Sequence, residues 1–183
     1  MKNLYFIRHG ESTANIIDQV GNDDARLTER GAAQAVAAGR HLQMNGINPD
    51  VILVSPLHRA KETALYVAQE IGYDESKIEM YDFLRERWFG DLELGNIKKD
   101  IGISLEYYFQ YPLSVDHVKN VEKLADLHKR AEKVIALAKS RPEDTVVIVS
   151  HGALLRSIYK VIEGIPYDRP IPPFENAKVL RLI

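Results

Sequence analysis

Short runs of consecutive apolar residues alternate along this chain with longer segments whose apolar residues recur every three or four positions. An apolar run of four or five residues is typical of a strand buried on both faces, and the longer repeat is typical of an amphipathic helix. Five runs predict strands, of which the third is the weakest: Leu4–Ile7, Val51–Val54, Ile78–Tyr81, Thr145–Val149 and Ala177–Leu182.

Four segments with the helical repeat lie between these runs, over residues 28–45, 55–72, 121–141 and 154–162. Thr28 is predicted to cap the first helix, because its hydroxyl can accept a hydrogen bond from a free backbone N–H of the first turn. Ser55 is predicted to cap the second helix, with Pro56 at the first helical position, where the missing N–H has no helical partner to lose.

Strands that alternate with helices form a mostly parallel sheet that is covered on both faces. The predicted fold class is α/β, a three-layer αβα sandwich with a mostly parallel central sheet. Residues 83–118 interrupt the alternation, since they are irregular and rich in aromatic side chains. We interpret them as an inserted lid over the mouth of the sheet, where an active site is expected, within a single domain of residues 1–183.

Composition and charge exclude several classes of function. The 183 residues carry a formal net charge of −2, which argues against binding of nucleic acid or of a membrane surface. Cysteine is absent, so disulfides, thiolate catalysis and zinc–cysteine sites are excluded. No apolar run has the length of a membrane span or of a signal peptide core. We therefore expect a cytoplasmic protein, either a monomer or a homodimer.

Two His-Gly pairs, His9-Gly10 and His151-Gly152, lie at the ends of the first and fourth strands. Open parallel sheets bind ligands at the carboxyl ends of their strands, and glycine there lets the backbone approach an anion closely. Arg8 precedes the first pair, and Arg59 lies in the first turn after the second strand, at the same edge of the sheet. Guanidinium groups neutralise phosphoryl charge that a metal ion would otherwise neutralise. These residues predict a phosphate pocket that uses no metal and no other cofactor.

The other histidines and the aromatic residues have ordinary structural interpretations. His41 is expected to be exposed, and no acidic cluster at ligand spacing near the histidines indicates a metal site. Trp88 and Phe89 are predicted to form a wall for the leaving group, because they follow Glu86. The remaining aromatic residues of 83–118 are predicted to form a small core beneath the lid.

Five blocks of residues that follow one another along the chain are similar to the pattern of one known family. They are Arg8-His9-Gly10-Glu11-Ser12 with Asn15, residues 24–31 with Gln34-Ala35, residues 55–60 with Glu62-Thr63-Ala64, Leu84-Arg85-Glu86 with Gly90, and Ser150-His151-Gly152 with Arg156. On these blocks the chain resembles the histidine phosphatase superfamily, the phosphoglycerate mutase-like proteins. A lone Arg-His-Gly motif would be weak evidence for this family, but five blocks in the same order over nearly the whole chain are strong evidence.

The resemblance implies a role for each residue of the predicted pocket. His9 is expected to be the nucleophile, which forms a phosphohistidine that water then hydrolyses. Glu86 is expected to donate a proton to the leaving oxygen and then to act as a base toward water. The residues expected to hold the phosphoryl group and its transition state are Arg8, Asn15, Arg59, His151 and Gly152.

Elementary chemistry agrees with these roles. Neutral imidazole is a competent nucleophile near pH 7, because its unperturbed pKa is about 6.5 and adjacent cations favour the neutral form. A glutamic acid beside a phosphate suits a general acid. Glu86 lies between Arg85 and Arg87, however, so solvated ion pairing is the competing interpretation of this residue.

Departures from the mutase pattern favour hydrolysis. Cofactor-dependent phosphoglycerate mutases typically have Glu-Arg-His-Tyr where this chain has residues 86–89, and His-Gly-Asn where it has His151-Gly152-Ala153. Their paired arginines have no match between Leu94 and Val118. Leu94 stands where phosphatase relatives usually have glycine. We expect this change to reshape the loop near Glu86, so it bears on which substrate is bound more than on which reaction is catalysed.

The predicted function is therefore that of a metal-independent phosphomonoesterase acting on a small phosphorylated metabolite. Phosphoglycerate mutase-type phosphoryl transfer is one alternative. A second alternative is a non-catalytic module that binds a phosphorylated ligand and lacks the acid–base action of Glu86. A nucleotide-binding doubly wound domain has no support, because neither glycine-rich phosphate fingerprint follows the first strand.

Overall fold

The computed structural model describes residues 3–92 and 94–183, apart from the side chains of residues 105 and 106. Met1, Lys2 and Glu93 belong to the predicted domain of residues 1–183, and Glu93 to the predicted lid, but these three lie outside the described residues.

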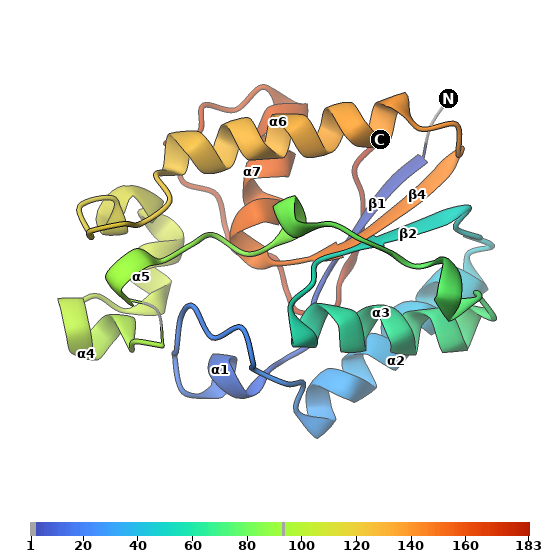
Figure 1. The fold of residues 1–183 in the computed structure, drawn as a ribbon, viewed down its shortest axis with the longest axis horizontal. Coiled ribbons are helices and arrows are strands. Elements are labelled where there is room, and N and C mark those ends of the chain that lie inside the picture. The colour runs from blue at the N-terminus through green and yellow to red at the C-terminus, as the bar shows by residue number, and fades with distance from the viewer. Residues whose placement is uncertain (1–2, 93) are drawn as a thin grey trace.

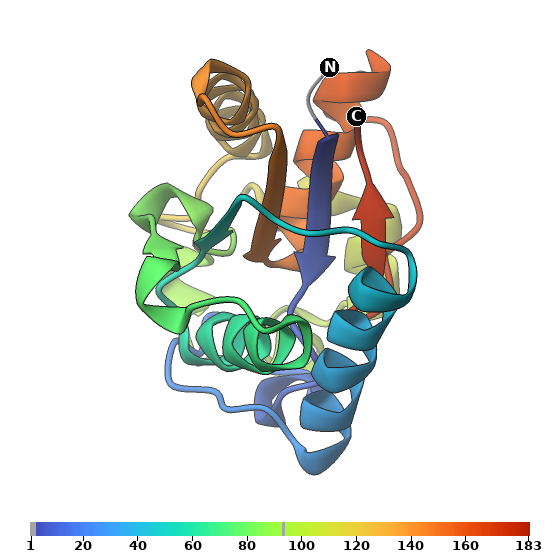
Figure 2. The ribbon, with the colours of Figure 1, turned by 90° about the vertical axis from the view of Figure 1, so that its right-hand side faces the viewer.

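The core of the fold is a five-stranded sheet in the order β3-β2-β4-β1-β5. Its strands are β1 (Asn3–Arg8), β2 (Val51–Val54), β3 (Glu79–Met80), β4 (Thr145–Ser150) and β5 (Val179–Arg181). All neighbours pair in parallel except β5, which runs antiparallel to β1 at one edge. Figure 2 shows β1 between β4 and β5. The prediction of a mostly parallel sheet is confirmed.

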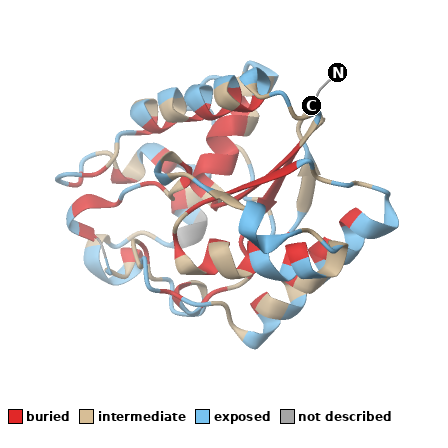
Figure 3. Cartoon of the chain, turned by 45° about the vertical axis from the view of Figure 1, so that its right-hand side comes forward, coloured by how far each residue is buried: buried red, intermediate tan, exposed pale blue. Residues whose placement is uncertain are grey.

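Helices cover both faces of this sheet and form the outer layers of the sandwich. The long helices are α2 (Glu29–Met44), α3 (His58–Ile71), α6 (Leu124–Ser140) and α7 (Gly152–Glu163). Alternate residues of each strand face opposite layers: Phe6 packs with α6 and α7, and Ile7 packs with α2 and α3. In Figure 1, α6 and α7 lie above the strands and α2 and α3 below them. The three-layer αβα class is confirmed, and Figure 3 shows the buried residues concentrated in the strands and on the inner sides of the helices.

The helix boundaries confirm one predicted cap and correct another. The Thr28 side chain accepts a hydrogen bond from the Gly31 N–H at 3.0 Å, as expected of the α2 cap. Ser55 does not cap α3, which begins at His58 with Leu57 in the cap position. The Ser55 hydroxyl instead lies 2.7 Å from Nε2 of His151, so this side chain makes a contact at the edge of the sheet. The helices α6 and α7 begin at Leu124 and Gly152, within three residues of their predicted starts.

The segment 83–118 is made of short elements, and most of it lies beyond the carboxyl ends of the strands, at the left of Figure 1. The short helices of the chain are α1 (Thr13–Ile16), η1 (Glu75–Lys77), η2 (Asp82–Leu84), η3 (Gly90–Leu92), α4 (Ile97–Ile101), α5 (Leu105–Gln110) and η4 (Pro112–Val115). The segment has a small core of its own, in which Phe89 and Tyr108 are buried. Tyr107 and Tyr111 are exposed and pack on each other, so for these two the expectation of a core position is wrong.

The helices in the described part of the chain are too short or too polar to cross a membrane.

Candidate active site

The sheet register brings the two His-Gly pairs together. Arg8 on β1 pairs with Ser150 on β4, so the next residues, His9 and His151, leave neighbouring parallel strands at the same level. Their rings lie 5.2 Å apart between centroids, at an interplanar angle of 58°. The prediction that both histidines meet at one edge of the sheet is confirmed.

His9 is held in a single tautomer by its own turn. The Nδ1–H donates to the Gly10 carbonyl at 2.7 Å, and because a carbonyl only accepts, the proton must be on Nδ1. Nε2 is therefore the nitrogen with the free lone pair, and it accepts a hydrogen bond from Arg59 Nε at 3.3 Å. Burial, and then the charges of Arg59 and Arg8, hold the pKa of His9 well below its usual value of 6.5. His9 is thus a neutral imidazole whose Nε2 carries the lone pair that can act as a nucleophile.

The turn that carries His9 is fixed by a close contact between two backbone segments. A Cβ on Gly10 would lie 2.3 Å from the Gly31 carbonyl oxygen at the start of α2. The Gly10 N–H also donates to the Thr63 hydroxyl on α3 at 3.0 Å. Only glycine allows this approach, so helices from one layer of the sandwich set the position of His9.

His151 is completely buried at the N-terminal end of α7 and does not line the open cavity described below. Its Nε2 is 2.7 Å from the Ser55 hydroxyl after β2. Its Nδ1 has no hydrogen-bond partner among the described residues. Burial, and then the charge of Arg59, hold the pKa of His151 well below 6.5. A buried polar atom without a partner is costly, so Nδ1 is suited to a ligand that reaches it.

Arg8 and Arg59 are anchored at one nitrogen each by backbone carbonyls. Arg8 donates to Phe174 O at 2.7 Å, while its Nε is buried without a partner among the described residues. Arg59 donates to Asn22 O at 2.6 Å. Burial, in opposition to the charge of Glu86, lowers the pKa of Arg8 to about 10, so Arg8 is still a cation at neutral pH. Carbonyl anchors fix these side chains without neutralising their charge.

Gly152 brings helix α7 close to Arg8. A Cβ on Gly152 would lie 3.2 Å from Arg8 Nε, tighter than an ordinary contact. The first N–H groups of a helix are free to bind an anion, and the helix dipole favours negative charge there. Gly152 therefore lets a helix N-terminus and a guanidinium share one small site.

Asn15 belongs to the short helix α1 and lines the same cavity. Its Oδ1 accepts hydrogen bonds from the backbone N–H and the hydroxyl of Ser12, both at 3.0 Å. The oxygen of the amide is therefore occupied, and the NH2 group remains for an anion.

Glu86 follows η2 and points at the start of α7. Its carboxylate accepts hydrogen bonds from the Ala153 N–H at 3.1 and 3.3 Å and from the Arg87 N–H at 2.9 Å. The neighbouring arginines are engaged elsewhere: Arg85 pairs with Asp82 and Asp23, and Arg87 with Asp116. The competing interpretation, solvated ion pairing of Glu86 with the arginines beside it, is therefore not what the structure shows.

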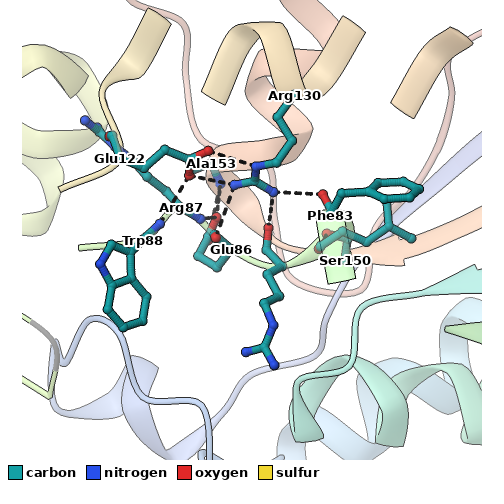
Figure 4. A network of polar contacts seen from close by, with 10 residues as sticks. Phe83, Glu86, Arg87, Trp88, Glu122, Arg130, Ser150 and Ala153 are labelled. Atoms are coloured by element: carbon teal, nitrogen blue, oxygen red, sulfur yellow. Dashed lines mark hydrogen bonds and ion pairs between the residues drawn. The ribbon is translucent and has the colours of Figure 1, made fainter. Parts of the chain in front are cut away.

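Arg130 of α6 holds the backbone around Glu86 (Figure 4). Its guanidinium donates to Phe83 O at 2.9 Å, to Arg85 O at 2.7 Å and to Glu86 O at 3.3 Å. The other edge of the guanidinium binds both carboxylate oxygens of Glu122, at 2.7 and 2.8 Å. Glu122 in turn accepts the Trp88 N–H at 3.2 Å. Residues on both sides of Glu86 are thus fixed to one helix.

A cavity of about 70 Å³ opens between these groups. Six of the seven predicted site residues line it, namely Arg8, His9, Asn15, Arg59, Glu86 and Gly152, whereas the seventh, His151, does not. Phe89 lines the cavity, as predicted, but Trp88 is 52% exposed and does not line it, so the prediction for Trp88 is wrong.

Several lining residues were not predicted. Tyr108 and Phe109 reach the cavity from α5, and Gln19 and Asn22 from the loop after α1. Their positions depend on how irregular segments fold, which the apolar pattern does not encode. Arg156 also lines the cavity, and it belongs to the fifth block of the family resemblance, so a signal for this residue was present in the sequence.

The cavity carries its positive charge on three arginines, Arg8, Arg59 and Arg156, against the single carboxylate of Glu86. Within residues 3–92 and 94–183, no three His, Asp or Glu side chains are grouped as metal ligands would be. An anion that enters the cavity meets guanidinium groups and backbone N–H groups.

Comparisons with known proteins identify the family. Residues 4–182 match the family described as the histidine phosphatase superfamily, branch 1. A 2,3-bisphosphoglycerate-dependent phosphoglycerate mutase from Bartonella quintana is 31% identical to this chain over 172 residues, which are 90% of this chain and 82% of the mutase.

Solved structures with the same fold include two named phosphatases. A mycobacterial glucosyl-3-phosphoglycerate phosphatase in complex with VO3 aligns with a TM-score of 0.81 at 26% identity, over 99% of this chain and 92% of that one. A variant of a phosphoserine phosphatase from Entamoeba histolytica, in complex with phosphoserine, aligns with a TM-score of 0.74 at 27% identity, over 98% and 89%. Mutases and phosphatases are thus both represented among the relatives.

Proposed function

The chain belongs to the histidine phosphatase superfamily, and on this premise we propose that it is a phosphomonoesterase that hydrolyses a small phosphorylated metabolite through a phosphohistidine on His9, without a metal ion. The observation that carries the proposal is the state of His9. This imidazole is neutral, its proton is on Nδ1, and its Nε2 is directed toward Arg59 in a cationic cavity that also contains Glu86.

In the first step Nε2 of His9 attacks the phosphorus atom, an N–P bond forms, and the P–O bond to the leaving alcohol breaks. Glu86 donates its proton to the leaving oxygen, so the alcohol departs neutral and the glutamate becomes a carboxylate. Nδ1 keeps its proton throughout, because it is bound to the Gly10 carbonyl.

In the second step water attacks the phosphohistidine. The Glu86 carboxylate takes a proton from the water, the new P–O bond forms, and the N–P bond breaks. Inorganic phosphate leaves, while His9 is again neutral and Glu86 again protonated. Each of the two residues thus returns to its starting state.

Charge stabilisation is the contribution of the remaining residues. Arg8 and Arg59 bind phosphoryl oxygens, and the NH2 group of Asn15 and the N–H groups at the start of α7 provide further donors. We assign His151 the same role: in the tautomer in which its Nε2 accepts from the Ser55 hydroxyl, the unpaired Nδ1 carries a proton for a phosphoryl group that reaches it. Phosphoryl transfer depends mainly on positioning and on charge neutralisation, so this set is sufficient in principle without a cation.

Hydrolysis is supported over mutase action by a departure in the sequence and by the structural relatives. A mutase must bind a phosphoglycerate whose phosphate moves between two oxygens, and it must keep its phosphohistidine from water. The curated relative from Bartonella quintana is named a mutase, but its family's paired arginines have no match in residues 94–118. The structural relatives named above are phosphatases.

The direct test is turnover of p-nitrophenyl phosphate in EDTA between pH 5 and 8. We expect hydrolysis by the wild-type protein, its loss in the His9→Ala variant, and a smaller decrease in the Glu86→Gln variant, because the p-nitrophenolate leaving group needs little protonation. Absence of turnover with folded wild-type protein would contradict the proposal and favour a binding module. A second assay supplies 3-phosphoglycerate with a trace of 2,3-bisphosphoglycerate. Formation of 2-phosphoglycerate faster than release of inorganic phosphate would establish a mutase instead.

A further inference from the structure

Asn176 connects the loop before β5 to the nucleophile of the proposed reaction. Its side-chain Nδ2 donates a hydrogen bond to the His9 carbonyl at 2.8 Å, across 167 positions of the sequence. Asn176 belongs to none of the five blocks of the family resemblance, and it does not line the cavity. Any effect of this side chain on the reaction must therefore pass through His9.

The peptide group that joins His9 to Gly10 is bound at both ends. Asn176 binds its oxygen, and its N–H, that of Gly10, donates to the Thr63 hydroxyl on α3 at 3.0 Å. A peptide group is planar, so a rotation about its long axis moves its oxygen and its N–H in opposite directions. The two hydrogen bonds together therefore fix an orientation that glycine, with its wide conformational freedom, does not fix by itself.

The orientation of this peptide group determines how the His9 ring is held. The Gly10 carbonyl accepts the Nδ1–H of the ring at 2.7 Å. A rotation of the preceding peptide group changes ψ of His9 and φ of Gly10, and so moves that carbonyl relative to the ring. The ring would then lose the acceptor that keeps its proton on Nδ1 and leaves the lone pair on Nε2.

The backbone beside Asn176 has an unfavourable conformation that serves the same contact. Ala177 is buried and has a φ of +53°, the left-handed region in which a Cβ is disfavoured. Its N–H donates to the Arg8 carbonyl at 2.8 Å, although the pairing of β5 with β1 ends at Val179 and Ile7. Strained backbone persists where its surroundings require it. Here it directs two donors at consecutive carbonyls of the strand end that carries the nucleophile.

The phosphate-binding arginine on this strand is anchored independently of the Asn176 amide. Arg8 donates from its guanidinium to the Phe174 carbonyl at 2.7 Å, and its own carbonyl accepts from the Ala177 N–H. Removal of the Asn176 side chain leaves both of these hydrogen bonds in place. The nucleophile and the phosphate cradle are therefore separable by substitution at this position.

We propose that Asn176 is a positioning residue, which fixes the His9–Gly10 peptide group and thereby keeps the proton of His9 on Nδ1 and directs its Nε2 at the phosphorus atom. This inference rests on the proposed function, because that function makes His9 the nucleophile.

The first test separates phosphoryl transfer from phosphate binding. In Asn176→Ala the single-turnover rate of p-nitrophenol release from p-nitrophenyl phosphate should fall about 10- to 100-fold, because small displacements of a reacting atom have effects of this size. The calorimetric Kd for inorganic phosphate should stay close to that of the wild type, because the arginines keep their anchors. A weaker affinity for phosphate with an unchanged rate would overturn the inference.

The matched control is Asn45→Ala, which removes a hydrogen bond of the same kind at the end of α2. There the side-chain Nδ2 of Asn45 donates to the His41 carbonyl at 2.7 Å. The control should keep the single-turnover rate of the wild type. An equal decrease in both variants would show that the loss at Asn176 is a general effect on the fold and would contradict a positioning role.

Asn176→Asp tests the donated hydrogen bond in a side chain of nearly the same shape. Its carboxylate cannot donate to the His9 carbonyl, whereas its protonated form can. The ordinary pKa of an aspartate is about 3.9, and partial burial beside a carbonyl oxygen raises it. The single-turnover rate of this variant, relative to the wild type at the same pH, should therefore be lowest at pH 8 and rise toward pH 5. A constant ratio would contradict the inference.

The tautomer of His9 provides a readout that needs no turnover. In protein labelled with ¹⁵N at histidine, long-range NMR correlations identify the protonated ring nitrogen, and the His9 signals are those missing in His9→Ala. At pH 7.5 we expect a proton on Nδ1 in the wild type, and in Asn176→Ala a shift of both nitrogens toward the average of the two tautomers. Unchanged His9 signals in folded Asn176→Ala would overturn the inference. If the wild type turns over no phosphomonoester but the signals shift as expected, the proposed function fails and the positioning of His9 by Asn176 is supported.

Discussion

At the scale of single residues, the charge state of the two site histidines is the property that the fold controls most strongly. Burial first, and then the arginines around them, hold the pKa of both His9 and His151 well below the usual 6.5. In the unfolded chain the same groups titrate near that value. The folded protein therefore keeps both imidazoles neutral at pH 7, which a nucleophile at His9 requires.

This difference makes stability depend on pH. Below about pH 6.5 the unfolded chain binds protons at these histidines that the folded protein does not bind, so the free energy of unfolding should fall as the pH is lowered. Each histidine contributes a slope of at most about 1.4 kcal/mol per pH unit, until the pH reaches the lowered pKa of the folded state. Urea denaturation at pH 7 and pH 5, in buffer without phosphate, measures the loss.

His9→Asn should reduce that loss, because one of the two groups is removed. The matched control is His41→Asn, which removes an exposed histidine from α2. An equal loss of stability in His9→Asn and in the wild type would show that His9 is not held neutral by the fold.

Six of the seven residues predicted for the site line the cavity, but the prediction that Trp88 lines it was wrong. Arg8, His9 and His151 could be assigned because strand ends of a parallel sheet meet at one edge. The departure at Leu94 was also informative: its φ is +62°, the left-handed conformation for which the glycine of relatives is suited. That Phe89 lines the cavity and Trp88 is exposed depends on local backbone geometry in an irregular segment, which residue type alone does not determine.

At the scale of elements, loops between regular elements carry the chemistry and helices hold them in place. The expectation of a Ser55 cap on α3 was wrong because capping rules treat a serine as serving its own helix. Here the hydroxyl contacts His151, which follows β4 and lies 96 residues further along the chain. A tertiary contact of this kind cannot be derived from the local pattern, although α3 itself was predicted from its apolar repeat.

The loop that carries Glu86 is attached to helix α6 through Arg130, and this is the clearest example of a helix that holds a loop of the site in place. We predict that Arg130→Met lowers kcat for an alkyl phosphate such as glycerol 3-phosphate about 10- to 100-fold, because a general acid contributes at least that much and must be held in position. The effect should be much smaller on p-nitrophenyl phosphate, whose leaving group needs little protonation. Arg130→Lys should recover part of the loss.

The control for Arg130 is Lys129→Met, which removes an exposed cation from the same helix. A purely structural role for Arg130 would reduce the rates on both phosphate esters by the same factor. If the variant is folded, that outcome would show that Arg130 does not position Glu86.

At the scale of the whole molecule, the sandwich concentrates reactive groups from distant parts of the chain at one edge of the sheet. The parallel sheet and its helical layers followed from alternating apolar patterns, because burial on two faces determines those patterns. The segment 83–118 was identified as an interruption, but its contribution of Tyr108 and Phe109 to the cavity required the tertiary structure. The family and the residues at the sheet edge could therefore be predicted from the sequence more completely than the shape of the cavity.

The central claim is that one neutral imidazole, His9, captures the phosphoryl group. The measurement that tests it most directly is rapid mixing of the protein with p-nitrophenyl phosphate, followed by quenching in alkaline denaturant and mapping of the trapped phosphate by mass spectrometry. We expect an acid-labile phosphate on His9 in the wild type and none in His9→Ala. A trapped phosphate on any other residue, or full turnover by His9→Ala, would contradict this account.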